Sequence, residues 1–187
     1  MMKTMLPLLM TCLICAIGSA QHTNQEITLD NGQKFLVGEI TKENLSRTGY
    51  ANWYLPNLKN YAPNHEILSA IEEDLQGYQI LIFLGTWCGD SKREVPRFLK
   101  ILETANFPND QLKIVALDKR KGKYKQSPTG EEWGLQILRV PTFILYKNGR
   151  EVNRIIESPN TSLEKDLQKI IRRQGYIPNK AKSMHFD

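Results

Sequence analysis

The chain has 187 residues, of which 41% are hydrophobic and 24% are charged, and its formal net charge is +5. This length and composition are typical of one soluble globular domain with a substantial core, and the absence of internal repeats excludes a repeat architecture. The mild positive charge favours acidic partners slightly and distinguishes no class of function on its own.

Residues 1–20 have the pattern of a secretory signal peptide. Lys3 supplies a positive start, residues 5–17 form an almost unbroken apolar run, and Gly18-Ser19-Ala20 is a small-residue cleavage site. We expect cleavage near Ala20 and export to the periplasm or the exterior. No stable membrane insertion is expected afterwards, because the run is short for a membrane span. An uncleaved N-terminal anchor is the alternative.

Cleavage would leave one cysteine in the mature chain. Of the 3 cysteines, Cys12 and Cys15 lie within the predicted signal, so Cys88 alone remains. The mature chain could then form no intramolecular disulfide. A single thiol in an exported protein is a candidate for reactivity, because such proteins usually keep their cysteines in pairs.

Residues 21–65 are predicted to form an extension ahead of the main domain. The predicted elements are a β-hairpin of 26–29 and 34–37 around Asn31-Gly32, then a helical turn over 41–45. The stretch 50–61 is rich in aromatic residues and contains Pro56. It either offers a surface to a partner or packs its rings on the core, and packing is the commoner role of aromatic side chains.

The middle of the chain predicts a β-α-β unit with parallel strands. Its predicted elements are a helix over 65–75, a strand over 78–84, a helix over 89–105 and a strand over 112–117. Pro96 lies inside the second helix, where it removes one hydrogen bond and should bend the helix.

The last third begins with the basic loop 119–125, which is either a solvated loop or a site for an anion or a partner. Nucleic acid is not an expected partner of an exported protein. The further predicted elements are a short helix over 127–135, a hairpin of 140–146 and 150–156 around Asn148-Gly149, a helix from Ser162 to Gly175, and a flexible tail over 176–187.

The stretch Gly85–Lys92 lies where the strand over 78–84 passes into the helix over 89–105. Cys88 is therefore expected at a helix N-terminus, where unpaired N–H groups and the helix dipole favour the thiolate. A thiolate is the form that attacks disulfides. The sequence thus predicts that Cys88 is a nucleophile.

Two motifs in this chain resemble the thioredoxin family. Trp87-Cys88-Gly89-Asp90-Ser91-Lys92 is similar to the family motif Trp-Cys-Gly-Pro-Cys-Lys, and Val140-Pro141-Thr142-Phe143 resembles the family strand that opens with a cis-proline. The resemblance implies an α/β thioredoxin-like fold over residues 66–175, with a central mixed sheet flanked by helices. It also implies that substrate docks on Trp87, Gly89, Asp90, Val140, Pro141 and Thr142.

The motif departs from the family at two positions. Ser91 stands in place of the second cysteine, and Ile82 stands where thioredoxins carry a buried acidic residue. A hydroxyl cannot resolve a mixed disulfide at neutral pH. Ser91 therefore argues against ordinary dithiol oxidation or reduction. We expect catalysis by Cys88 and Ser91 together, with monothiol exchange or isomerisation at Cys88 and a hydrogen bond from Ser91 to the thiolate.

An external thiol would then resolve the adduct, and glutathione or another small thiol is the candidate; no other cofactor is expected. The expected partners are thiols and disulfides of exported proteins.

Four other interpretations of Cys88 compete with this one. The chain could be a redox-inactive binding or chaperone-like module on the same fold, or Cys88 could be a buried structural residue. A cysteine protease would need a nearby histidine, and His22, His65 and His185 support no triad. A metal site is not expected, because one mature cysteine and 3 scattered histidines provide too few ligands.

Overall fold

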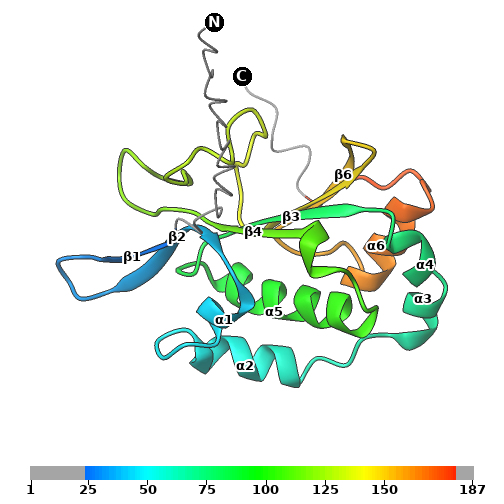
Figure 1. The fold of residues 1–187 in the computed structure, drawn as a ribbon, viewed down its shortest axis with the longest axis horizontal. Helices are drawn as coiled ribbons and strands as arrows, with labels where there is room; N and C mark the ends of the chain where they lie inside the picture. The colour runs from blue at the N-terminus through cyan, green and yellow to red at the C-terminus, as the bar shows by residue number, and fades with distance from the viewer. Residues whose placement is uncertain (1–23, 180–187) are drawn as a thin grey trace, which may run out of the picture.

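The computed structural model describes residues 24–179, which form a mixed β-sheet with helices packed on it (Figure 1). The sheet has 6 strands in the order β1-β2-β4-β3-β5-β6. β3 and β4 run parallel, and the other neighbouring pairs of described strands run antiparallel. The bounds are β1 Gln25–Thr28, β2 Lys34–Ile40, β3 Gln79–Leu84, β4 Leu112–Ala116, β5 Thr142–Lys147 and β6 Arg150–Ile156. The predicted α/β fold with a mixed sheet is confirmed.

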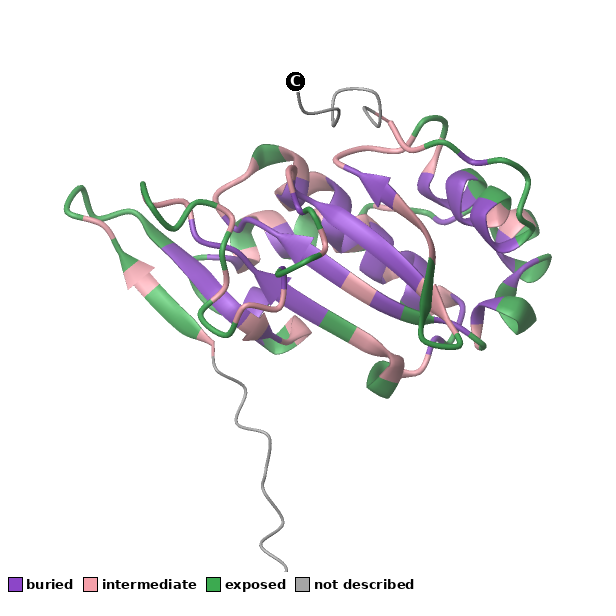
Figure 2. Cartoon of the chain, turned by 90° about the horizontal axis from the view of Figure 1, so that it is seen from above, coloured by how far each residue is buried: buried purple, intermediate pink, exposed green. Residues whose placement is uncertain are grey.

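The described helices lie on one side of the sheet, and irregular segments cover the other side (Figures 1 and 2). The longest is α5, which crosses beneath the central strands. The bounds are α1 Lys42–Leu45, α2 Ala51–Lys59, α3 His65–Ser69, α4 Glu72–Leu75, α5 Gly89–Thr104 and α6 Leu163–Ile171, with a 3₁₀ turn over Asn109–Gln111.

Strand β3 is buried on both faces, and its side chains alternate between two cores. Ile80, Ile82 and Leu84 pack with the helices in the larger core. Phe83 packs in a smaller core on the opposite face, with Leu81 beside it. Because successive side chains of a strand point to opposite faces, a continuous apolar run suits a strand covered on both sides. Such a strand holds the segment that follows it in a fixed place.

Both hairpins predicted from Asn-Gly pairs are confirmed. Asn31-Gly32 joins β1 to β2, and Asn148-Gly149 joins β5 to β6. At the second turn both Asn148 (φ 53°) and Gly149 (φ 73°) have the positive φ that a tight hairpin turn requires. Asn and Gly tolerate this region better than other residues, so the turn chemistry sets the register of the pairs next to the turn. The register shifts once further along, between Leu145 and Tyr146.

The short helix predicted over 127–135 does not form, and this segment runs as successive turns. The physical reason lies in its glycines and its acidic side chains. Gly130 and Gly134 both have φ 75°, outside the helical region. Glu132 turns back and accepts hydrogen bonds from the backbone and hydroxyl of Ser127. Trp133, expected on a helix, is 79% exposed.

Two other helix predictions need correction. The helix predicted over 65–75 is divided into α3 and α4, because Ile71 adopts φ −131° and ψ −7° and starts a new helix as its N-cap. The last helix begins after its Ser162 cap as predicted, but it ends at Ile171, and Arg173 already has φ 52°. Tyr176, counted with the flexible tail, is buried and donates a hydrogen bond to Asp166.

The aromatic stretch 50–61 forms α2, which packs against α5. Tyr50 and Tyr54 are buried, and Trp53 and Tyr61 are partly buried against the larger core. Packing is therefore the main role of these rings. The predicted signal peptide and the end of the tail fall within 1–23 and 180–187, outside the described residues. Within 24–179, no helix combines the length and apolarity needed to cross a membrane.

Candidate active site

Cys88 is the N-cap residue of α5, directly after the loop that follows β3. Its backbone is extended (φ −91°, ψ 130°), its N–H donates to Gly85, and its carbonyl accepts from Lys92 in the first turn of the helix. The side chain is half-buried. Helix N-termini carry partial positive charge, so this position favours negative charge on the sulfur.

The segment 139–142 lies opposite Cys88. β5 runs antiparallel to β3 with Thr142 paired to Phe83, so the start of β5 meets the end of β3. The Val140–Pro141 peptide bond is cis. Thr142 donates its hydroxyl to the carbonyl of Arg139 at 2.7 Å, which closes the turn. The Cys88 thiol donates to the carbonyl of Val140 at 3.2 Å. Two segments 52 residues apart thus meet at the sulfur.

Trp87 shields one side of the site. Its indole N–H donates to the carbonyl of Leu117 at 2.8 Å, which fixes the ring over the end of β4. Gly85 is required by this ring, because a Cβ at that position would lie 2.6 Å from the indole. Tyr124 lies against Trp87, with its ring centre 5.6 Å from that of the indole.

Ser91 is completely buried, one helical turn after Cys88. Its Oγ accepts a hydrogen bond from the backbone N–H of Gly85 at 3.1 Å. This bond ties the first turn of α5 to the end of β3 and leaves the hydroxyl hydrogen available to another acceptor. The predicted donation from Ser91 to the Cys88 thiolate stays a prediction.

Gly89 is exposed and Asp90 is partly exposed at the start of α5. Asp90 is paired with Arg93 at 2.7 Å, and Arg93 also reaches the buried carboxylate of Glu94 at 2.6 Å. The hydrogen bond to Glu94 is the main cause that raises the pKa of Arg93 above its ordinary value. The negative charge of Asp90, which would oppose a thiolate, is therefore balanced within the same helix turn.

A family model described as Thioredoxin matches residues 64–172, more than half of the chain. The chain belongs to the thioredoxin family. The match begins after β1, β2, α1 and α2, so these elements precede the matched segment.

Similar proteins share modest identity with this thioredoxin-family chain. A thioredoxin-like protein of Acanthamoeba polyphaga mimivirus is 25% identical over 104 residues, 55% of this chain and 69% of that protein. A thioredoxin of Malassezia sympodialis is 28% identical over 85 residues, 46% of this chain and 73% of that protein. Among solved structures, Chlamydomonas reinhardtii thioredoxin f2 shares 20% identity over 59% of this chain and 91% of its own, with a TM-score of 0.33.

Ile82, at the position where the resemblance implies a buried acid, is 0% exposed and packs in the larger core. One buried acid, Glu94, lies shortly after the motif, and another, Asp118, follows the end of β4. Each of them is paired with an arginine. Glu94 is paired with Arg93, and Asp118 is paired with Arg120 at 2.6 Å. Both carboxylates are therefore engaged in ion pairs.

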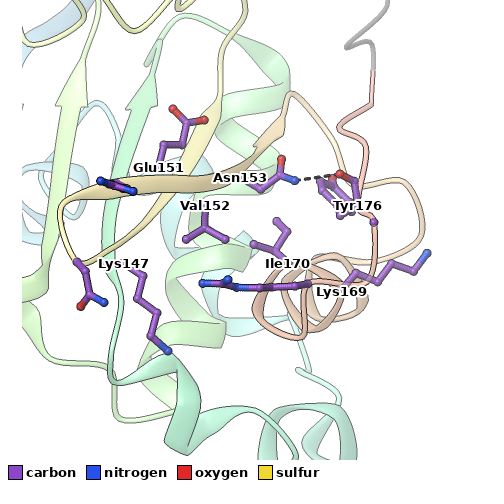
Figure 3. Close-up of a pocket in the computed structure, with 11 residues that line it drawn as sticks. Lys147, Glu151, Val152, Asn153, Lys169, Ile170 and Tyr176 are labelled. Carbon is purple, nitrogen blue, oxygen red and sulfur yellow. Dashed lines mark hydrogen bonds between the residues drawn. The ribbon is translucent and has the colours of Figure 1, made fainter.

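A cleft of about 830 Å³ between β6 and α6 is far from this chemistry (Figure 3). Lys147 and Asn153 line it from the hairpin, and Lys169 and Tyr176 line it from the C-terminal segment. The β5–β6 turn lies beside the start of β3, whereas Cys88 follows the end of β3. The described residues contain no group of three or more His, Cys, Asp or Glu side chains placed to hold a metal ion.

Sequence reasoning missed two residues that shape the site. Thr86 is buried, and its Oγ1 accepts from the backbone N–H of Leu36 at 3.0 Å, which ties the active-site loop to β2. Tyr124 lies in the basic loop and contacts Trp87. No local pattern marks either contact, because both join segments that are far apart in the sequence.

Proposed function

We propose that this thioredoxin-family protein carries out monothiol thiol–disulfide exchange on exported proteins, with Cys88 as the nucleophile. The observation that supports the proposal most is the position of the thiol. Cys88 caps a long helix, is half-buried and faces the carbonyl of Val140, while the residue at the resolving position is Ser91. The site therefore combines a candidate nucleophile with a candidate docking segment, and Cys88 is the one thiol in residues 24–179.

The reaction proceeds in two exchanges. In the first, the Cys88 thiolate attacks one sulfur of a substrate disulfide, a new disulfide joins Cys88 to that sulfur, and the other sulfur leaves as a thiolate. In the second, an external thiolate attacks the substrate sulfur of the mixed disulfide, and Cys88 leaves as a thiolate. If the second thiolate belongs to the same substrate, the substrate disulfide is rearranged without net oxidation or reduction.

We infer the docking surface from the residues that surround the sulfur. Val140, Pro141 and Thr142 form the segment that faces Cys88, and Trp87 with Gly89 and Asp90 borders it. We infer that a substrate chain lies along these residues. Glutathione or another small thiol is the candidate for the resolving step when the substrate provides no second thiol. The inferred export rests on the signal-like pattern of residues 1–20.

A redox-inactive binding module is the second candidate. It is favoured by Ile82, since the site lacks both the second thiol and the buried acid of a dithiol enzyme. The aromatic residues of α2 do not strengthen it, because most of them are packed against the core.

Trapping in the native host tests the proposal. Cells that produce the wild-type chain, or a Cys88→Ser variant, are quenched with acid, and covalent partners are separated without reductant. Monothiol exchange predicts exported proteins that are released from the wild type by reductant alone and are absent from the variant. The same partners on both proteins, with no covalent adduct, would support the binding module instead.

A further inference from the structure

The basic loop after β4 is closed at its base beside the active site. The N–H of Asp118 donates to the carbonyl of Gln126 at 2.9 Å, and the N–H of Lys125 donates to the carbonyl of Asp118 at 2.8 Å. The Asp118 carboxylate is held by the backbone and the guanidinium of Arg120. Lys119 and Lys121 lie in the part of the loop between these hydrogen bonds, whereas Lys125 takes part in one of them.

Lys125 differs from Lys121 and Lys123, the exposed lysines of this loop. It has φ 59°, a conformation that costs free energy for a residue with a side chain and is kept only where contacts enforce it. Its side chain is partly buried, and its ammonium donates to the carbonyl of Leu138. The same ammonium lies 4.9 Å from the centre of the Tyr124 ring.

Two independent contacts link Lys125 to segments that adjoin Cys88. Leu138, which accepts from the ammonium, is two residues before Val140, whose carbonyl accepts from Cys88. On the other side, Tyr124 contacts the ring of Trp87, the residue that precedes Cys88. The ammonium is bound to a neutral carbonyl, so its charge is not cancelled by that contact.

The charged groups that act on Lys125 are Arg139, Glu157 and Cys88. Burial is the main cause that lowers the pKa of Lys125 below its ordinary value, and the positive charge of Arg139 adds to it. Glu157 and a negative charge on Cys88 act in the opposite direction. Arg139 and Glu157 are paired with each other at 3.2 Å, and on α5 Asp90 is paired with Arg93. Each of these pairs joins one positive and one negative side chain, so its formal net charge is zero.

We propose that Lys125 is a positioning residue whose ammonium stabilises the thiolate of Cys88. The inference rests on the proposed monothiol exchange and deepens it. A site with one thiol must present Cys88 as a thiolate for attack and must release it as a thiolate when an external thiol resolves the adduct. A nearby cation favours both events, because it stabilises the charged form of the sulfur. The proton of the thiol passes to solvent, and no oxidant is consumed.

The test measures alkylation of Cys88 by iodoacetamide as a function of pH in three variants. Lys125→Met removes the charge and keeps the length of the side chain, Lys125→Arg keeps the charge, and Lys123→Met removes an exposed lysine two residues earlier. Near pH 6.5, we expect Lys125→Met to react about threefold to tenfold more slowly than the wild type, and the difference should shrink as the pH rises past about 9. Lys125→Arg and Lys123→Met should follow the wild type.

A profile for Lys125→Met that matches the wild type at every pH would overturn the inference. So would an equal slowing at every pH that Lys125→Arg does not rescue, because this pattern would indicate loop damage and not loss of charge. The assay uses no disulfide substrate. A wild type that forms no covalent adduct in the trapping experiment would refute the proposed function, whether or not the alkylation profile depends on Lys125.

Discussion

Removal of the Ser91 hydroxyl should lower the stability of the fold, because its oxygen accepts a buried backbone hydrogen bond. Ser91 is 0% exposed, and its Oγ accepts the backbone N–H of Gly85 at 3.1 Å in a buried setting. In Ser91→Ala the N–H of Gly85 loses its partner and stays shielded from water. A buried donor without a partner costs about 1–3 kcal/mol. We therefore expect the free energy of unfolding to fall by about 1.5–2 kcal/mol.

Urea unfolding, followed by tryptophan fluorescence and circular dichroism, measures this loss. For a domain of this size, such a change corresponds to a fall in Tm of about 3–8 °C. Ser46→Ala is the matched control, because Ser46 is exposed and its hydroxyl only donates to Lys42 within the same helix end. The control should stay within about 0.5 kcal/mol of the wild type. An equally small change in Ser91→Ala would refute a structural role for the Gly85 bond.

Two further predictions concern the active-site loop and the response to alkali. Thr86→Val removes the buried acceptor of the Leu36 N–H and should lower the free energy of unfolding by about 1–2 kcal/mol. Thr86→Ser keeps the hydroxyl and should retain most of the wild-type stability. Equal losses in both variants would contradict the reasoning. Burial raises the pKa of Tyr54 from 10.0 to about 12, so its contribution to stability is complete below pH 10 and is lost as the pH rises towards 12. Urea titrations at matched pH should therefore show that Tyr54→Phe loses less stability than the wild type between pH 10 and 12. Parallel plots of unfolding free energy against pH would contradict the raised pKa of Tyr54.

Local patterns predicted the elements whose causes are local. The Asn148-Gly149 turn, the strand before Cys88 and the helix after it follow from turn chemistry and apolar periodicity within a few residues. The helix expected over 127–135 was wrong because Gly130 and Gly134 leave the helical region and Glu132 bonds back to Ser127. Trp133, which lies in this segment, is exposed.

The candidate site was predictable only in part, because it joins segments far apart in the sequence. Cys88 at a helix N-terminus follows from the sequence around it. The approach of Val140 depends on the pairing of β5 with β3, and here the family resemblance supplied what periodicity could not. The base of the basic loop could not be anticipated, since Lys125 reaches the site through contacts with Leu138 and Tyr124 that no spacing encodes.

The most direct test of the central claim is to follow by intact mass the reaction of the protein with a disulfide-linked dimer of a peptide that has a single cysteine, so that the bound peptide carries no second thiol. Reduced wild type and a Ser91→Cys variant are each mixed with the dimer and quenched with acid at intervals, with Cys88→Ser as the blank. The account predicts that the wild type accumulates a one-to-one mixed disulfide at Cys88 that persists until glutathione is added. The Ser91→Cys variant should instead release both peptide thiols and form its own disulfide. A wild type that releases both peptide thiols with no added thiol, or that forms no adduct at all, would contradict monothiol exchange.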